Sequence, residues 1–373
     1  MKICILSMQR VTNFGSLLQS YSLKKMIEEL GHQVAFIDIQ RNEADDALMN
    51  EIRHSFASEE EGSGSFLSKL RKVDRYTLNR LHIKQLWKNQ GILFEDFRRE
   101  VLNINDEDND KQYDVCVIGS DEVFNCMTPA RWGFTSQLFG NVPQAKKVIT
   151  YAASCGATVY SELTEAVQNR IRETFLGVSA FSARDQNTEN FIRCLTDKKV
   201  LCHLDPVVVG DFRKELESSS LPDGLPKHYC IVYSYYNRIH EKEDIRAIQK
   251  FCKKKGIEPV GLGAPQMWIK YNLSISPFEA LAVFEKADFI ITDTFHGAIL
   301  SAKFNGHFAV MLRGSNMHKL GDLVQRLDIE NYVIRNFSEL DSAYSQANSI
   351  PDFQIISQGE RERTLECLKE NLI

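Results

Sequence analysis

The chain has 373 residues, of which 43% are hydrophobic and 25% are charged, and its formal net charge at pH 7 is −5 with a pI of about 6.0. A chain of this length exceeds what one hydrophobic core usually supports, so we expect two domains. The acidic balance leaves no broad basic field for a nucleic-acid backbone, and no nucleic-acid partner is expected.

The first elements form a strand–helix–strand unit. Residues 2–7 have the pattern of a buried strand, and residues 9–15 form a polar loop. Residues 16–30 repeat apolar side chains at helical spacing and end at Gly31, before a second strand pattern at 33–39. This order predicts a βαβ unit with two parallel strands.

The first residues of the chain and the lengths of its apolar runs bear on the cellular compartment of the protein. The sequence turns polar at Ser7, too soon for a signal peptide, and no apolar run approaches the length of a membrane span. We therefore expect a cytoplasmic protein. Peripheral contact with the inner face of a membrane stays compatible with these observations.

Residues 41–100 interrupt the alternation of strands and helices. Acidic and small residues dominate 41–66, which predicts an excursion that is either a lid or an ordinary surface loop. Residues 67–100 are amphipathic and helical, with Lys and Arg between apolar residues. Such a helix presents either a solvated face or a cationic face for an anionic lipid carrier.

The alternation of strands and helices then resumes and forms two successive sets. Strands are predicted at 113–118, 147–151, 178–182 and 200–203, and, after a Pro- and Ser-containing linker at 211–227, at 229–235, 258–262, 289–292 and 307–312. Helices are predicted at about 161–176, 186–194, 241–255, 277–286, 317–327 and 358–370.

These patterns predict an α/β protein of two Rossmann-like domains facing a cleft, with parallel sheets and helices on both faces. The first domain comprises residues 1–220 and the second residues 221–357. The helix at 358–373 is expected to pack back on the first domain. No G-x-G-x-x-G, P-loop or G-x-S-x-G motif and no metal-ligand spacing occurs, so neither a cofactor nor a metal is expected.

Two clusters at strand ends lie in the first half of the chain. Asn13 and Gly15 open the first helix, where a close backbone and a helix N-terminus suit an anion or a sugar hydroxyl, or merely cap the helix. Ser120 and Asp121 follow a strand, where the carboxylate either binds sugar hydroxyls and acts as a base or caps the next element.

Two further clusters carry cationic groups. Arg184 follows the strand at 178–182 and can bind a carboxylate or phosphate, or pair with Asp185 or the nearby Glu189. His296 stands between an apolar strand and a small-residue helix, beside Gly297, where it can move a proton near neutral pH. Open α/β sheets bind their ligands at such places.

Taken together, six pieces of sequence resemble the polysaccharide pyruvyl transferase family. In chain order they read NFGSLLQSY, VIGSDEVFN, TYAASCG, SARD, LDP and TDTFHGA, at 13–21, 117–125, 150–156, 182–185, 204–206 and 292–298. The resemblance implies a GT-B-like fold and the transfer of a pyruvyl group from phosphoenolpyruvate to two hydroxyls of a sugar. The product would be a pyruvate ketal on a cell-surface polysaccharide precursor, expected to be a lipid-linked glycan intermediate, and phosphate would be released.

The resemblance also assigns roles. Arg184 and His296 are expected to bind the donor. Some members have an arginine at the position of Thr294, and here Arg313 or Lys319 would have to take the place of that arginine. The expected catalytic residues are His296, Arg184 and Asp121. Donor binding is assigned to Arg184, Thr294, His296, Gly297 and Lys319, and acceptor binding to Asn13, Gly15, Ser120 and Asp121.

Two other functions fit the same sequence. One is a GT-B glycosyltransferase that uses a nucleotide sugar, and the other is a non-catalytic glycan-binding protein. The acceptor sugar is not readable from the sequence. Its aromatic candidates for sugar contact are Phe14, Phe124, Trp132 and Trp268.

Overall fold

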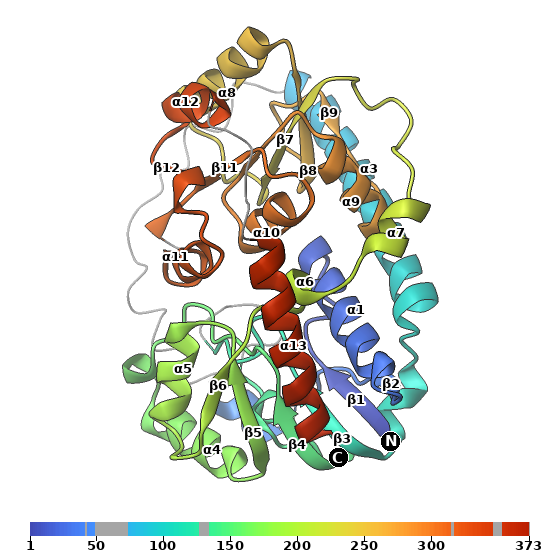
Figure 1. The fold of residues 1–373 in the computed structure, drawn as a ribbon, viewed down its shortest axis with the longest axis vertical. Coiled ribbons are helices and arrows are strands. Elements are labelled where there is room, and N and C mark those ends of the chain that lie inside the picture. Colours follow the sequence, from blue (N-terminus) through green and yellow to red (C-terminus); the bar gives the residue numbers. More distant parts are fainter. Residues whose placement is uncertain (42, 49–73, 127–133, 315–316, 346–352, 373) are drawn as a thin grey trace.

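The protein folds as two domains, each built on one parallel sheet (Figure 1). The computed structural model describes residues 1–41, 43–48, 74–126, 134–314, 317–345 and 353–372. Within this part of the chain, six strands form each sheet, and the pairs between adjacent strands are parallel. The predicted fold class, two Rossmann-like domains facing a cleft, is confirmed.

The first sheet contains the six strands that lie before residue 203. They are β1 (Lys2–Leu6), β2 (Gln33–Phe36), β3 (Tyr113–Ile118), β4 (Ala145–Thr150), β5 (Val178–Ala183) and β6 (Val200–Cys202), in the order β2-β1-β3-β4-β5-β6. Strands β2 and β3 lie on opposite sides of β1. The strand order therefore reverses between β1 and β3, because β2 is added on one side of β1 and β3 to β6 on the other. The loops after these two strands therefore diverge and leave a crevice at their carboxyl ends.

The second sheet repeats this plan. Its strands are β7 (Tyr229–Ser234), β8 (Glu258–Gly263), β9 (Tyr271–Asn272), β10 (Phe289–Thr292), β11 (Phe308–Met311) and β12 (Val333–Ile334), in the order β12-β11-β10-β7-β8-β9. The reversal here lies between β7 and β10. Strands β9 and β12 were not expected, because two residues are too few to show a periodic pattern.

Helices connect the strands. They are α1 (Phe14–Glu29), α3 (Asp74–Phe97), α4 (Glu165–Phe175), α5 (Gln186–Arg193), α6 (Pro206–Val209), α7 (Arg213–Ser218), α8 (Lys242–Lys255), α9 (Pro277–Lys286), α10 (Phe295–Phe304), α11 (Met317–Arg326), α12 (Leu340–Ser345) and α13 (Phe353–Asn371). The predicted linker thus contains a helix, α7. Among the described residues, no helix combines the length and the apolarity needed to cross a bilayer.

The alternation of side chains along the strands separates three cores. On β1, Ile3 and Ile5 face one buried cluster, while Cys4 and Leu6 face another that also holds Phe175 of α4. The second sheet likewise has an outer cluster against α8. The inner faces of both sheets share a single core with the helices between them. Since the outer faces are also covered by helices, each sheet has helices on both faces, as predicted.

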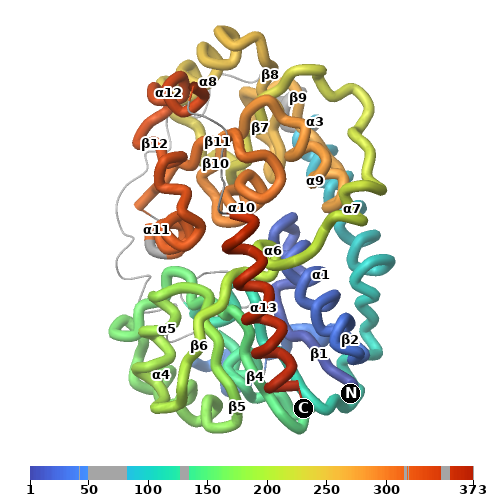
Figure 2. The backbone as a smooth tube through the Cα atoms, in the orientation of Figure 1, coloured from blue at the N-terminus to red at the C-terminus, as the bar shows by residue number. Residues whose placement is uncertain are grey.

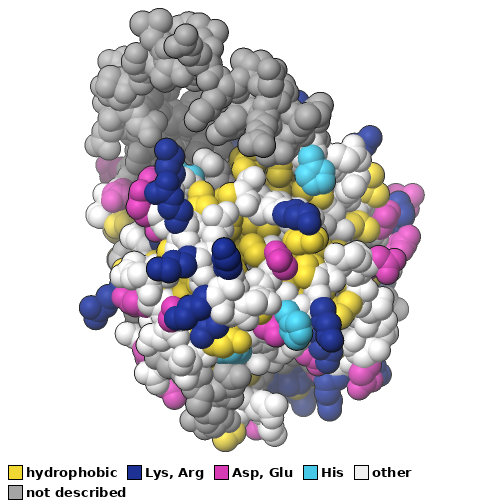
Figure 3. Space-filling view, turned by 90° about the horizontal axis from the view of Figure 1, so that it is seen from above, with side chains coloured by type: hydrophobic (Ala, Val, Ile, Leu, Met, Phe, Trp, Pro, Cys, Tyr) yellow, Lys and Arg dark blue, Asp and Glu magenta, His cyan; other side chains and the backbone are white. Residues whose placement is uncertain are grey.

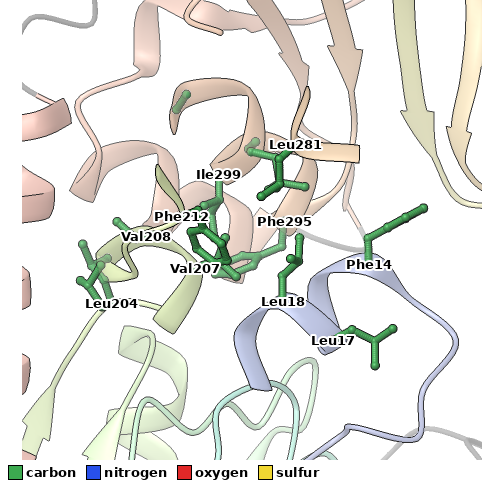
Figure 4. Packing of buried hydrophobic residues seen from close by; sticks show 14 of the residues in the cluster. Phe14, Leu17, Leu18, Leu204, Val207, Val208, Phe212, Leu281, Phe295 and Ile299 are labelled. Carbon is green, nitrogen blue, oxygen red and sulfur yellow. The ribbon is translucent and has the colours of Figure 1, made fainter. Parts of the chain in front are cut away.

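The shared core joins the two domains. Leu18 of α1 lies next to Phe295 of α10, near Leu281 of α9 and residues of α6 (Figure 4). Phe14 and Leu17 of α1 belong to the same buried cluster. Interfaces of this apolar kind restrict the movement of domains against each other. The carboxyl ends of the two sheets are therefore held in a defined mutual position.

Helix α3 packs against both domains (Figure 1). Its Phe94 meets Phe14 of the first domain at a ring distance of 4.9 Å, and its Gln90 exchanges two hydrogen bonds with the backbone of Ile275 in the second. The apolar side of this helix is thus buried in protein, and Lys84 and Lys88 lie on its exposed side. Contact of this exposed side with lipid stays a prediction, and the acidic segment at 49–66 lies outside the described residues.

Helix α13 leads the chain back from the second domain along the first (Figure 2). The Thr364 hydroxyl lies 3.0 Å from that of Tyr151, and Ser357 donates a hydrogen bond to the Val208 carbonyl. The predicted boundary at residue 220 lies between α7 and β7, and both domain limits stay predictions.

The face seen from above carries mixed charges (Figure 3). Lys and Arg side chains lie among Asp, Glu and apolar side chains, without a continuous basic field on the part of this face that is described.

Candidate active site

The reversal points of the two sheets open on one cavity of about 390 Å³. Its walls come from the loops after β1, β7, β8 and β10 and from α3. The lining residues are Val11, Thr12, Asn13, Trp87, Tyr233, Ser234, Tyr235, Tyr236, Gly263, Ala264, Thr294 and His296. Crevices at such reversal points are the usual ligand sites of open α/β sheets.

His296 enters this cavity from the first turn of α10. The apolar strand β10 ends at Thr292, and the Thr294 hydroxyl caps the helix by accepting a hydrogen bond of 3.0 Å from the Gly297 amide. A Cβ at Gly297 would lie 2.0 Å from the Thr292 hydroxyl, so only glycine fits there. The strand, cap and glycine together fix the His296 ring at the cavity wall.

Asp205 lies behind His296. Its carboxylate is fully buried, with Oδ2 3.6 Å from His296 Nε2 and 2.9 Å from Arg184 Nη1. Burial favours the neutral acid, but the His296 imidazole and the Arg184 guanidinium outweigh it and lower the pKa of Asp205 to about 2. The carboxylate of Asp205 is therefore ionised at neutral pH and faces the His296 ring.

Arg184 belongs to the same buried group. Its side chain is 2% exposed, and its guanidinium lies 4.2 Å from the centre of the Phe295 ring and 3.8 Å from Asp121 Oδ1. Phe295 and His296 are neighbours on α10, so Arg184 supports the start of that helix from the first domain. The guanidinium does not line the cavity described above, and its predicted role in donor binding stays a prediction.

The polar residues after β3 complete the group. Asp121 accepts a hydrogen bond of 2.6 Å from the Ser16 hydroxyl on α1, and the buried Ser120 hydroxyl donates to the Ala152 carbonyl. Ala153 bridges Asp121 and Ala183 in the sheet. All six pieces of the sequence motif therefore meet at one place, because each follows the carboxyl end of a parallel strand or begins the next helix.

Asn13 and Gly15 approach this place from α1. Asn13 lines the cavity and caps the helix by accepting a hydrogen bond of 2.8 Å from the Gly15 amide. A Cβ at Gly15 would lie 2.1 Å from Cγ and Nδ1 of His296. The absence of a side chain at residue 15 is what lets α1 pack directly on the imidazole.

This contact gives a prediction for Gly15→Ala. The methyl group must displace the His296 ring or α1, and a misplacement of about 1 Å in catalytic geometry costs about 100-fold in rate. We expect kcat of the reaction catalysed at this site to fall about 100-fold at saturating substrates. Gly359→Ala in α13 is the control, because no atom lies within 4 Å of its Cβ position; equal activities of the two variants would contradict the prediction.

Three cations surround the mouth of the second sheet. Lys319 on α11 pairs with Glu122 of the first domain, and Arg313 Nε lies 2.7 Å from Asp293 Oδ2. Arg238 donates to the Asp293 carbonyl and lies 4.5 Å from the centre of the Tyr235 ring. Lys319 and Arg313 were candidates from the sequence, but Arg238 was missed. Arg238 follows the strand pattern at 229–235 by only three residues.

Two of the four aromatic candidates from the sequence are contradicted by their burial. Phe14 and Phe124 are 1% and 0% exposed and belong to the core, and Trp132 lies outside the described residues. Trp268 donates to the Ile239 carbonyl and does not line the cavity. The cavity is lined instead by Trp87, Tyr235 and Tyr236, and only the strand-end position of the two tyrosines could have indicated them.

The comparison with protein families decides the relationship. The profile of the polysaccharide pyruvyl transferase family matches residues 13–315, which is most of the chain and includes every motif residue described above. The chain belongs to this family. No curated protein sequence matches it significantly.

Solved structures resemble this family member only distantly. The UDP-GlcNAc 2-epimerase of Methanocaldococcus jannaschii in complex with UDP-GlcNAc and UDP is 12% identical, with a TM-score of 0.49 over 99% of this chain and 100% of that chain. MnaA of S. aureus, bound to UDP, is also 12% identical, with a TM-score of 0.49 over 100% and 96%. The calicheamicin glycosyltransferase is 15% identical, with a TM-score of 0.45 over 100% and 98%.

Proposed function

We propose that this family member transfers the pyruvyl group of phosphoenolpyruvate to two hydroxyls of a sugar in a cell-surface polysaccharide precursor. The transfer forms a pyruvate ketal and releases phosphate. The observation that supports this most is the position of His296, which lines the cavity between the domains and faces a buried, ionised Asp205. A histidine at such a place can give a proton to a substrate held in the cavity.

The chemistry begins with protonation of the methylene carbon of phosphoenolpyruvate by His296. The carbon that bears the phosphate then has positive character, and one sugar hydroxyl attacks it. Phosphate leaves with its bonding electron pair, and the second hydroxyl closes the ketal. Of the two hydroxyl protons, one returns to His296 and the other leaves with phosphate, so the reaction needs no further reactant.

His296 has a second role open to it. As a cation it could hold the donor phosphate at the N-terminus of α10, where the helix dipole favours negative charge. The cations Arg238, Arg313 and Lys319 lie around the same sheet end and would bind the remaining negative charges of the donor. Asn13, Ser120 and Asp121 of the first domain are assigned to the acceptor.

A direct assay tests this function. The protein is incubated with phosphoenolpyruvate and a panel of methyl glycosides and lipid-linked glycans, and both phosphate release and ketal formation are measured. We expect equal amounts of phosphate and ketal with at least one acceptor. Thermal stabilisation by a nucleoside diphosphate but not by phosphoenolpyruvate, without any ketal, would overturn the proposal in favour of nucleotide-sugar chemistry.

A further inference from the structure

We propose that Trp87, Tyr235 and Tyr236 form the acceptor subsite, in which one pyranose ring of the acceptor packs on their aromatic side chains beside His296. This inference rests on the proposed function. It assigns a role to α3, whose segment matches none of the family motifs and whose function the sequence left open. It also places part of the acceptor site on the second domain, which the sequence assigned to the donor.

The three aromatic residues come from two separate elements. Trp87 lies on α3, and its ring meets that of Tyr236 at 6.3 Å between centroids, with an angle of 68° between the ring planes. Tyr235 and Tyr236 follow β7 and remain 43% and 48% exposed although they are large and aromatic. Exposed aromatic rings gathered in one cavity mark a binding surface rather than a core.

The position of Tyr235 is supported by its neighbour. Arg238 stacks on its ring at 4.5 Å and also donates to the Asp293 carbonyl, one residue before Thr294. The Tyr235 ring is thereby tied to the segment that carries His296. A ligand that packs on the aromatic wall would have its neighbouring hydroxyls close to the proposed proton donor.

The chemistry of the lining selects a neutral ligand. Among the described lining residues, His296 is the only one with a side chain that can carry a positive charge, and none is acidic. The others are aromatic or small, or carry hydroxyl and amide groups, as Thr12, Asn13 and Ser234 do. A pyranose has an apolar C–H face and a rim of hydroxyls, and both match this lining. A nucleoside diphosphate would place two phosphates against a described lining in which His296 alone can carry a positive charge.

The test compares Trp87→Ala and Tyr236→Ala with Trp87→Phe and Tyr236→Phe, which keep a ring. We expect the alanine variants to raise the acceptor KM at least tenfold and to leave the KM for phosphoenolpyruvate within twofold of the wild type. The phenylalanine variants should recover most of the acceptor affinity. An unchanged acceptor KM, or an equal rise in both KM values, would overturn the proposal.

A binding measurement separates this proposal from the proposed function. Methyl glycosides of hexoses and N-acetylhexosamines are titrated into the wild type and into Trp87→Phe and Trp268→Phe, and tryptophan fluorescence is recorded. We expect a saturable change that Trp87→Phe abolishes and Trp268→Phe retains. If this occurs without ketal formation, the subsite stands and pyruvyl transfer is wrong. If ketal forms but no glycoside signal depends on Trp87, the subsite is wrong. Circular dichroism confirms that each variant is folded.

Discussion

His296→Gln should lower kcat for ketal formation by about 10²- to 10⁴-fold, the usual contribution of a positioned general acid. Glutamine keeps a polar side chain of similar length at the cavity wall but cannot transfer a proton. The fold should survive, because the buried Asp205 carboxylate keeps its closer partner, Arg184 Nη1, at 2.9 Å. Phosphate release at saturating phosphoenolpyruvate and acceptor measures the effect, and thermal unfolding checks the fold.

The same variant distinguishes the two roles of His296. If the histidine donates the proton, kcat falls and the KM for phosphoenolpyruvate changes little. If it holds phosphate, the KM for phosphoenolpyruvate rises as well. His240→Gln is the matched control, since the His240 side chain is 57% exposed and pairs with Glu241 outside the cavity. A His296→Gln variant with kcat within threefold of the wild type would exclude the histidine from the reaction.

Asp205→Asn should destabilise the protein by about 3 to 5 kcal/mol, because it leaves the buried Arg184 guanidinium without its closest counter-charge. The pair is almost completely removed from solvent, with side chains 2% and 0% exposed. The loss is measured as the free energy of unfolding in urea at pH 7. Activity should fall too, since Asp205 Oδ2 lies 3.6 Å from His296 Nε2 and helps to position that ring.

Acid titration gives the same prediction an independent readout. The pKa of Asp205 is lowered from 3.8 to about 2 in the folded protein. The ionised carboxylate therefore contributes its full stabilisation of the fold above pH 3.8, and this contribution is lost as the pH falls toward 2. This contribution is on the order of 2 kcal/mol. The difference in the free energy of unfolding between the wild type and Asp205→Asn should therefore become smaller as the pH falls from 4 to 2.

The control for Asp205 is an exposed ion pair. Asp341 lies 2.9 Å from Lys254 with side chains 47% and 61% exposed, and such pairs contribute about 0 to 1 kcal/mol. We expect Asp341→Asn to change the free energy of unfolding by less than about 1 kcal/mol. Equal losses in Asp205→Asn and Asp341→Asn would contradict the role of the buried pair.

Much of the fold follows from local patterns. The buried run in 113–118 and the helical spacing before Gly31 are signals within one segment, and the structure has β3 and α1 at these places. The capped start of α10 is also local, because Thr294, Gly297 and the preceding strand are neighbours in sequence. Short elements such as β9 were missed, since two residues carry no period and depend on the adjacent strand.

The candidate site was predicted only in part. The strand-end rule brought out Asp121, Arg184 and His296, because the carboxyl ends of parallel strands share one edge of a sheet. It did not indicate that Asp205 would stand between Arg184 and His296, since that depends on how the loop after β6 meets α10 of the other domain. Arg238 was missed for the same reason.

The sequence by itself determined the alternation of strands and helices, the positions of the strand-end residues and the family, because these are properties of contiguous segments. Only the tertiary structure decided that His296 faces a buried Asp205, that Gly15 packs on its ring, and that Trp87 of α3 lies beside Tyr236. These contacts join residues that are 91 to 281 positions apart in the sequence. They depend on the shared apolar core that sets one sheet against the other. No local pattern encodes the mutual position of two domains.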